Sequence, residues 1–119
     1  MEKVNLSEKF KKIKEIWSPK IVGELNGQLV KLGKFKNDFV WHHHENEDEL
    51  FLVVKGKIFI QFKEKEVTLE EGEFLIVPRG VEHKPYAPKE AHVLLFEPKS
   101  TLNTGNVLNE MTLKKLEAI

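Results

Sequence analysis

The sequence has no cysteine among its 119 residues. This absence excludes disulfide bonds, thiolate metal ligands and a cysteine nucleophile. Any metal chemistry must therefore use imidazole and carboxylate side chains. The lack of cysteine also fits a reducing compartment, and we expect the chain to be cytoplasmic.

Net charge and long hydrophobic runs are also missing. Nineteen basic residues balance nineteen acidic residues, so the formal net charge is zero, and no overall field attracts phosphate backbones or anionic lipid. No apolar run approaches the roughly 20 residues of a membrane span, and residues 1–20 carry lysines instead of the apolar core of a signal peptide. We therefore expect neither a nucleic-acid partner nor a membrane partner.

The composition that remains is that of an ordinary globular protein. Hydrophobic residues make up 40% of the chain and charged residues 32%, a balance that allows one buried core. The sequence predicts one domain, 1–119, divided into an N-terminal helical extension (1–20), a β-barrel core (21–98) and a C-terminal segment (99–119).

A short helix is predicted at each end of the chain. Near the N-terminus, apolar residues recur at three-, four- and seven-residue spacings, and Asn5 followed by Glu8 resembles a capping box. The apolar positions are Leu6, Phe10, Ile13, Ile16 and Trp17. Near the C-terminus, Leu113 and the run from Leu116 to Ile119 suggest a second helix that begins at Thr112.

The region between these helices alternates short β-branched and aromatic runs with turn residues. Turns are predicted at Asn26-Gly27, Lys55-Gly56, Lys63 to Glu66 and Glu71-Gly72, the first as a hairpin turn. The main predicted strands are Gln28 to Phe35, Glu49 to Val54, Lys57 to Phe62, Glu66 to Leu69, Phe74 to Val77 and Ala91 to Phe96, with shorter ones near Ile21 and His83. About eight strands without intervening helices predict an all-β, antiparallel sandwich or barrel.

The strand from Leu50 to Val54 is apolar at every position, so both of its faces should be covered. The N-terminal helix or a second subunit would provide that cover. We therefore expect a homodimer.

The spacing of the histidines is the pattern that most directly indicates a functional site. In an extended segment side chains alternate, so His42 and His44 face one side and His43 faces the other. Glu49 begins the following strand, and the turn Pro78-Arg79-Gly80 re-aims the chain before His83. A site of imidazoles and a carboxylate suits Fe(II), Mn(II), Zn(II), Ni(II) or Cu(II), and the donor set does not choose among them.

These residues resemble the two motifs of the cupin superfamily. His42-x-His44, Glu49 and Gly56 match the first motif, and Gly72, Pro78, Gly80 and His83 match the second. The resemblance extends over residues 28 to 97 and implies a jelly-roll β-barrel with one divalent metal ion bound by His42, His44, Glu49 and His83. Asp48 is the alternative carboxylate if Glu49 turns away.

Several aromatic and charged residues near the motifs are candidates for lining a pocket for a small-molecule ligand or substrate: Trp41, Phe51, Arg79 and Tyr86. The resemblance implies either a metalloenzyme with oxygenase- or isomerase-type chemistry, or a non-catalytic module that binds or senses a small molecule or metal. The ligand set does not determine the reaction, because many unrelated activities share this fold and metal site.

Overall fold

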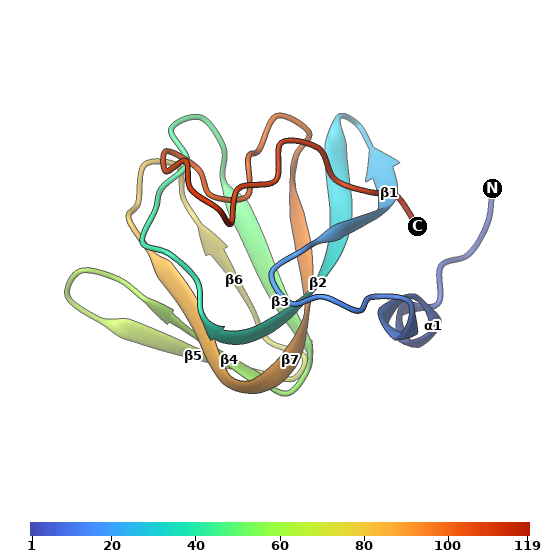
Figure 1. Ribbon diagram of the computed structural model, residues 1–119, viewed down its shortest axis with the longest axis horizontal. Helices are drawn as coiled ribbons and strands as arrows, with labels where there is room; N and C mark the ends of the chain where they lie inside the picture. Colours follow the sequence, from blue (N-terminus) through green and yellow to red (C-terminus); the bar gives the residue numbers. More distant parts are fainter.

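The computed structural model describes residues 1–119 and consists of seven antiparallel strands with one short helix (Figure 1). The elements are α1 (Leu6–Lys11), β1 (Lys20–Leu25), β2 (Gln28–Asp38), β3 (Glu49–Lys55), β4 (Lys57–Gln61), β5 (Glu66–Glu70), β6 (Phe74–Val77) and β7 (Lys84–Pro98). The predicted antiparallel jelly-roll architecture is confirmed. No helix is both long and apolar enough to cross a membrane.

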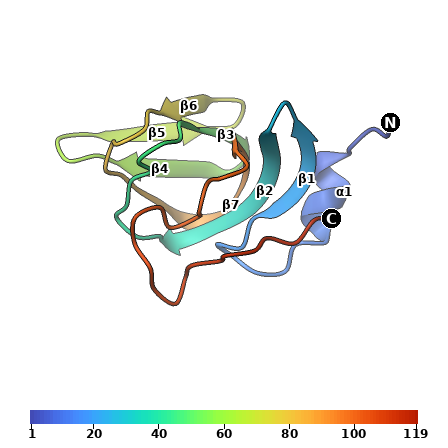
Figure 2. The same ribbon diagram turned by 90° about the horizontal axis from the view of Figure 1, so that it is seen from above.

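β7 is the strand that joins the two sides of the barrel. Its C-terminal part lies between β2 and β3, in the order β1-β2-β7-β3-β6, whereas its first residues pair with β4, which carries β5. β5 and β6 do not pair with each other, so the barrel is open between them (Figure 2). We predicted separate strands near His83 and from Ala91 to Phe96. They are one bent strand, and this reduces the expected eight strands to seven.

The predicted turns have the backbone conformations that their residues favour. Asn26 and Gly27 both have positive φ in the hairpin between β1 and β2. Gly56 has φ +87 between β3 and β4, and a Cβ atom there would come 3.3 Å from the backbone of Ala91. Glycine is therefore required at position 56 both by its conformation and by the close approach of β7.

The N-terminal helix forms, but it is shorter than the hydrophobic spacing predicted. The Asn5 side chain accepts a hydrogen bond from the Glu8 backbone N–H, as the capping pattern indicated, and the helix ends at Lys11. Phe10 and Ile13 pack on Leu32 in a small cluster outside the barrel, with Val54 against it. The helix therefore lies on the β1–β2 side of the sheet (Figure 2) and, through this cluster, also covers Val54 of β3, so it provides part of the expected cover.

The predicted C-terminal helix is wrong, because residues 99–119 contain no helix. The Thr112 hydroxyl, expected to cap a helix, instead bonds the Thr104 hydroxyl at 2.6 Å and accepts from the Asn109 backbone N–H. The last residues run extended beside β1, where the Ile21 N–H donates to the Glu117 carbonyl and the Ile119 N–H donates to the Ile21 carbonyl. The segment thus crosses one end of the barrel and pairs with an edge strand (Figure 1).

Candidate metal centre

His42 and His83 are joined by their backbones. Each N–H donates to the other residue's carbonyl, at 3.0 and 2.9 Å, so the two residues form an isolated antiparallel bridge. His42 Nδ1 lies 2.9 Å from the Val40 carbonyl, and His83 Nδ1 lies 2.8 Å from the Val81 carbonyl. Because a carbonyl only accepts, each Nδ1 carries the ring proton and each Nε2 retains a lone pair for a ligand.

His44 and Glu49 complete a buried group with these two histidines. His44 Nε2 lies 3.3 Å from Glu49 Oε1, and His83 Nε2 lies 3.5 Å from the same oxygen. One ligand atom from each of the four residues falls within 4.8 Å of all the others. All four residues are buried.

The fit to a metal ion is supported by polar atoms that have no partner. The buried atoms His44 Nδ1 and Nε2, Glu49 Oε1 and His83 Nε2 make no hydrogen bond. Buried polar atoms are nearly always satisfied, since leaving one unpaired costs roughly 1–3 kcal/mol. Imidazole nitrogens and a carboxylate oxygen that converge without partners are suited to a first-row divalent ion.

Burial and mutual contact set the charges of this group. Desolvation, followed by the nearby His83, lowers the pKa of His42 to about 4, so its imidazole stays neutral near pH 7. Burial alone would raise the pKa of Glu49, but the nearby His44 and His83 rings hold it well below its usual value. The group therefore presents a neutral His42 and an ionised carboxylate, the forms that bind metal ions.

Lys31 and Glu97 form an ion pair next to the candidate metal centre. The sequence analysis did not predict this pair. Lys31 Nζ lies 2.7 Å from Glu97 Oε1, and the two side chains are only 2% and 3% exposed. Burial and the neighbouring Glu49 carboxylate raise the pKa of Glu97 well above its usual value. The sequence carried one signal for this pair, the alternation of side chains along a strand. Lys31 lies on the same face of its strand as buried Leu29 and Phe35, and Glu97 lies on the same face as buried Leu95.

A cavity borders both this ion pair and the buried group of three histidines and Glu49. It measures about 30 Å³, and Lys31, Glu97, His42 and Glu49 all contribute to its wall. The rest of the lining is largely apolar and includes the aromatic rings of Trp17, Phe35, Phe39 and Phe51. Of the four residues expected to line a pocket, Phe51 is the one at this cavity.

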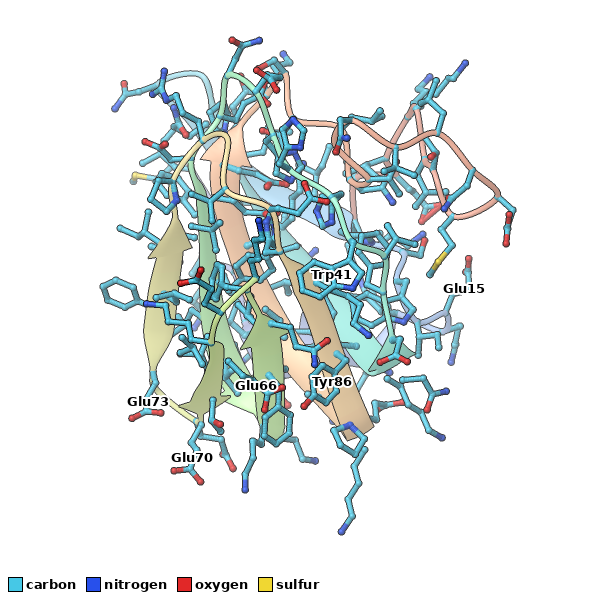
Figure 3. All side chains as sticks on the ribbon, turned by 90° about the vertical axis from the view of Figure 1, so that its left-hand side faces the viewer. Glu15, Trp41, Glu66, Glu70, Glu73 and Tyr86 are labelled. Atoms are coloured by element: carbon cyan, nitrogen blue, oxygen red, sulfur yellow. The ribbon has the colours of Figure 1, made fainter.

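The structure does not bring Trp41, Tyr86 and Arg79 to this cavity. Trp41 is 42% exposed, beside a separate surface groove that includes Glu66. The Tyr86 hydroxyl donates to Glu66 Oε1 at 2.7 Å, and Figure 3 shows the two side chains together on the outside of the barrel below Trp41. Arg79 is exposed and pairs with Asp48.

The alternative carboxylate, Asp48, lies outside the buried group of three histidines and Glu49. Its Oδ1 accepts a hydrogen bond from the Arg79 backbone N–H at 2.9 Å and thereby holds the Pro78-Arg79-Gly80 turn. His43 also points away from the group, as strand alternation predicted, with Nδ1 2.9 Å from Glu82 and Nε2 2.5 Å from Glu45. These two carboxylates raise the pKa of His43.

The C-terminal segment covers the centre. The Asn106 N–H donates to the His43 carbonyl, and the His43 N–H donates to Asn106 Oδ1 at 2.8 Å. A Cβ atom at Gly105 would lie 2.1 Å from the His43 carbonyl oxygen and 3.1 Å from the His42 ring. Only glycine lets the segment approach this closely, so position 105 allows the chain to pack directly against His42 and His43.

Comparison with known proteins agrees with this geometry. The family model described as "Cupin domain" matches residues 28–97. A cupin-2 domain containing protein from Shewanella frigidimarina has a solved structure that is 40% identical, with a TM-score of 0.80, over 81% of this chain and 94% of that chain. The uncharacterized protein YdbB of Bacillus subtilis is 39% identical over 64 residues, which are 53% of this chain and 57% of that protein, so the match spans little more than half of that relative.

A more distant structure extends the likeness at the level of the fold. Hydroquinone 1,2-dioxygenase from Sphingomonas sp. TTNP3 has a TM-score of 0.73 and 21% identity, over 83% of this chain and 33% of that chain. At this identity, the common feature is the arrangement of strands.

Proposed function

Since this chain belongs to the cupin domain family, we propose that it holds one divalent metal ion through His42, His44, Glu49 and His83 and acts as a small-molecule metalloenzyme. The observation that carries the proposal is the set of buried, unpaired nitrogen and oxygen atoms on residues that converge within 4.8 Å. Leaving these buried polar atoms without a partner is unfavourable, and a cation would satisfy Glu49 Oε1, His83 Nε2 and one ring nitrogen of His44 at once.

The protein would preorganise the metal ligands, because it fixes the orientation and the separation of their rings. The Val40 and Val81 carbonyls fix the ring orientation of His42 and His83, and the backbone bridge fixes their separation. Iron, manganese, zinc and nickel all suit three imidazoles and one carboxylate. A divalent ion with an open coordination position polarises a substrate oxygen or activates dioxygen, which is the basis of isomerase- or oxygenase-type chemistry.

A non-catalytic binding or sensing module is the second candidate. The observation in its favour is the small cavity of about 30 Å³, covered by the C-terminal segment that Gly105 seats on His43. A site of this size accepts little more than a few atoms unless the segment moves. Turnover of a panel of small hydroxylated and carbonyl compounds by the metal-loaded protein would separate an enzyme from a binding module.

Elemental analysis tests the proposal directly. Protein purified without chelator or affinity tag should contain close to one divalent metal ion per chain. The ion should be lost from His42→Ala and His83→Ala but retained in His92→Ala, because His92 lies away from the group and contacts Glu90 and Phe10. An absence of metal that persisted after anaerobic reconstitution with Fe(II), Mn(II), Ni(II) and Zn(II) would disprove metal binding.

A further inference from the structure

We infer that the metal centre takes a small anion, a carboxylate of a few heavy atoms, and that the Lys31 ammonium binds it inside the cavity. This inference rests on the proposed metal site and specifies the class of ligand that the site accepts. It follows from the buried Lys31–Glu97 pair, which no metal-binding role explains.

Lys31 has hydrogen-bonding capacity that the protein leaves unused. An ammonium group has three N–H donors, but the side chain makes one hydrogen bond, to Glu97 Oε1 at 2.7 Å. Lys31 is only 1% exposed, so water outside the barrel does not satisfy the other donors. A lysine this deeply buried is unfavourable unless its charge and its donors are matched.

Lys31 lines a cavity that it shares with two of the proposed metal ligands. Lys31, His42 and Glu49 line the same cavity, so one bound molecule can contact the ammonium while it approaches the metal-binding group. Glu97 Oε2 is also buried without a partner. The remaining wall is apolar except for Asn103 and offers no other cation.

The balance of buried charge favours an anion over a neutral molecule. With a divalent ion in place, the positive charges of the ion and Lys31 exceed the negative charges of Glu49 and Glu97, whether or not Glu97 is ionised. The three histidine ligands are neutral when they bind metal and do not change this balance. A net positive charge in a poorly hydrated interior is strongly stabilised by an anion placed within it.

The size of the cavity restricts the anion. On the measure that gives about 30 Å³ here, one water molecule needs about 10–15 Å³. The space therefore admits a molecule of a few heavy atoms, such as formate or acetate. Formamide and acetamide have nearly the same shapes without the charge, which makes them matched neutral probes.

The test is a titration of the Co(II)-loaded protein with formate, acetate, formamide and acetamide, followed by the visible absorption of the ion. We expect formate and acetate to bind at least tenfold more tightly than the corresponding amides. Lys31→Met should weaken the carboxylates at least tenfold and leave the amides unchanged, whereas Lys31→Arg should stay within about threefold of the wild type. Lys36→Met, on the exposed face of the same strand, is the matched control and should have no effect.

Lys31→Met leaves Glu97 buried and unpaired. If that variant does not fold for this reason, a second variant keeps the test valid. Lys31→Met/Glu97→Gln removes both charges and should fold, and it should lose carboxylate affinity because the donor is gone. Equal carboxylate binding by this variant and the wild type, or equal binding of formate and formamide by the wild type, would overturn the inference while the metal site stood. Failure of the wild type to bind Co(II) or any other divalent ion would instead overturn the metal site and the inference together.

Discussion

The depressed pKa of His42 links the buried histidine to the stability of the metal-free protein. Burial lowers this pKa from 6.5 to about 4 in the folded chain. Below pH 6.5 the unfolded chain binds a proton that folded His42 does not bind, so this residue's contribution to the free energy of unfolding decreases as the pH falls from 6.5 towards 4. We expect a loss of about 2 kcal/mol between pH 7 and pH 5 from His42 alone.

Chemical denaturation of chelator-treated protein at several pH values measures this effect. His42→Gln has no titrating ring and should lose about 2 kcal/mol less over the same interval than the wild type. Titrating groups that do not contact His42 act equally on both proteins and cancel in the comparison. If the two proteins had parallel stability profiles, the assigned burial effect on His42 would be wrong.

Among the individual residues, the four that converge were predictable and their neighbours were not. Motif spacing indicated His42, His44, Glu49 and His83, and all four lie together. Lys31 and Glu97 belong to no motif and lie 66 positions apart in sequence, so their pairing appears only when β2 and β7 are adjacent. A charged residue in phase with buried apolar residues of a strand is a signal that composition and motif analysis pass over.

At the scale of elements, the C-terminal segment packs against the proposed metal-binding group at Gly105. Gly105→Ala tests whether this packing supports the group. The new Cβ atom would overlap the His43 carbonyl and displace the segment from the His42 ring. We expect a loss of at least 2 kcal/mol in unfolding free energy, from backbone strain at φ +55 together with the overlap. Affinity for a divalent ion should also fall several-fold.

Gly72→Ala is the matched control for Gly105→Ala. Gly72 has φ +83, but a Cβ atom there meets nothing within 4 Å. Its substitution should cost about 1 kcal/mol from strain alone and leave metal affinity unchanged. Thermal unfolding and metal titration of both variants measure the difference. If Gly105→Ala behaved like Gly72→Ala in both measurements, the segment would not support the centre.

The elements themselves were predictable where local chemistry determines them. Asn26-Gly27, Gly56 and Gly72 indicated their turns because positive φ is a local requirement, and the predicted strand from Phe74 to Val77 has the same bounds in the structure. The C-terminal helix failed because nonlocal bonds decide that segment. Thr112 bonds Thr104, and Ile119 pairs with Ile21 across the whole chain.

At the scale of the whole molecule, the outer face of the sheet is only partly covered. α1 packs near Val54, but Phe74 and Ile76 on β6 are 59% and 52% exposed, next to Leu52 and Leu50 of β3. β6 is also an edge strand, so backbone groups on its free side have no partner strand. An edge with apolar side chains pairs most simply with its own copy about a two-fold axis, and we expect a homodimer through β6.

Light scattering measures the predicted dimer. The wild type should have about twice the 13.9 kDa mass of one chain, and Phe74→Lys should shift it to the monomer, because a charge at the centre of an apolar interface is left desolvated and unpaired. Leu108→Lys removes another exposed apolar side chain, 71% exposed on the C-terminal segment, and should leave the dimer intact. A wild type that stayed at the mass of one chain at high concentration would exclude the dimer. Dissociation by both variants would instead place the contact elsewhere or make it nonspecific, whereas dissociation by Phe74→Lys alone would assign it to the β6 edge.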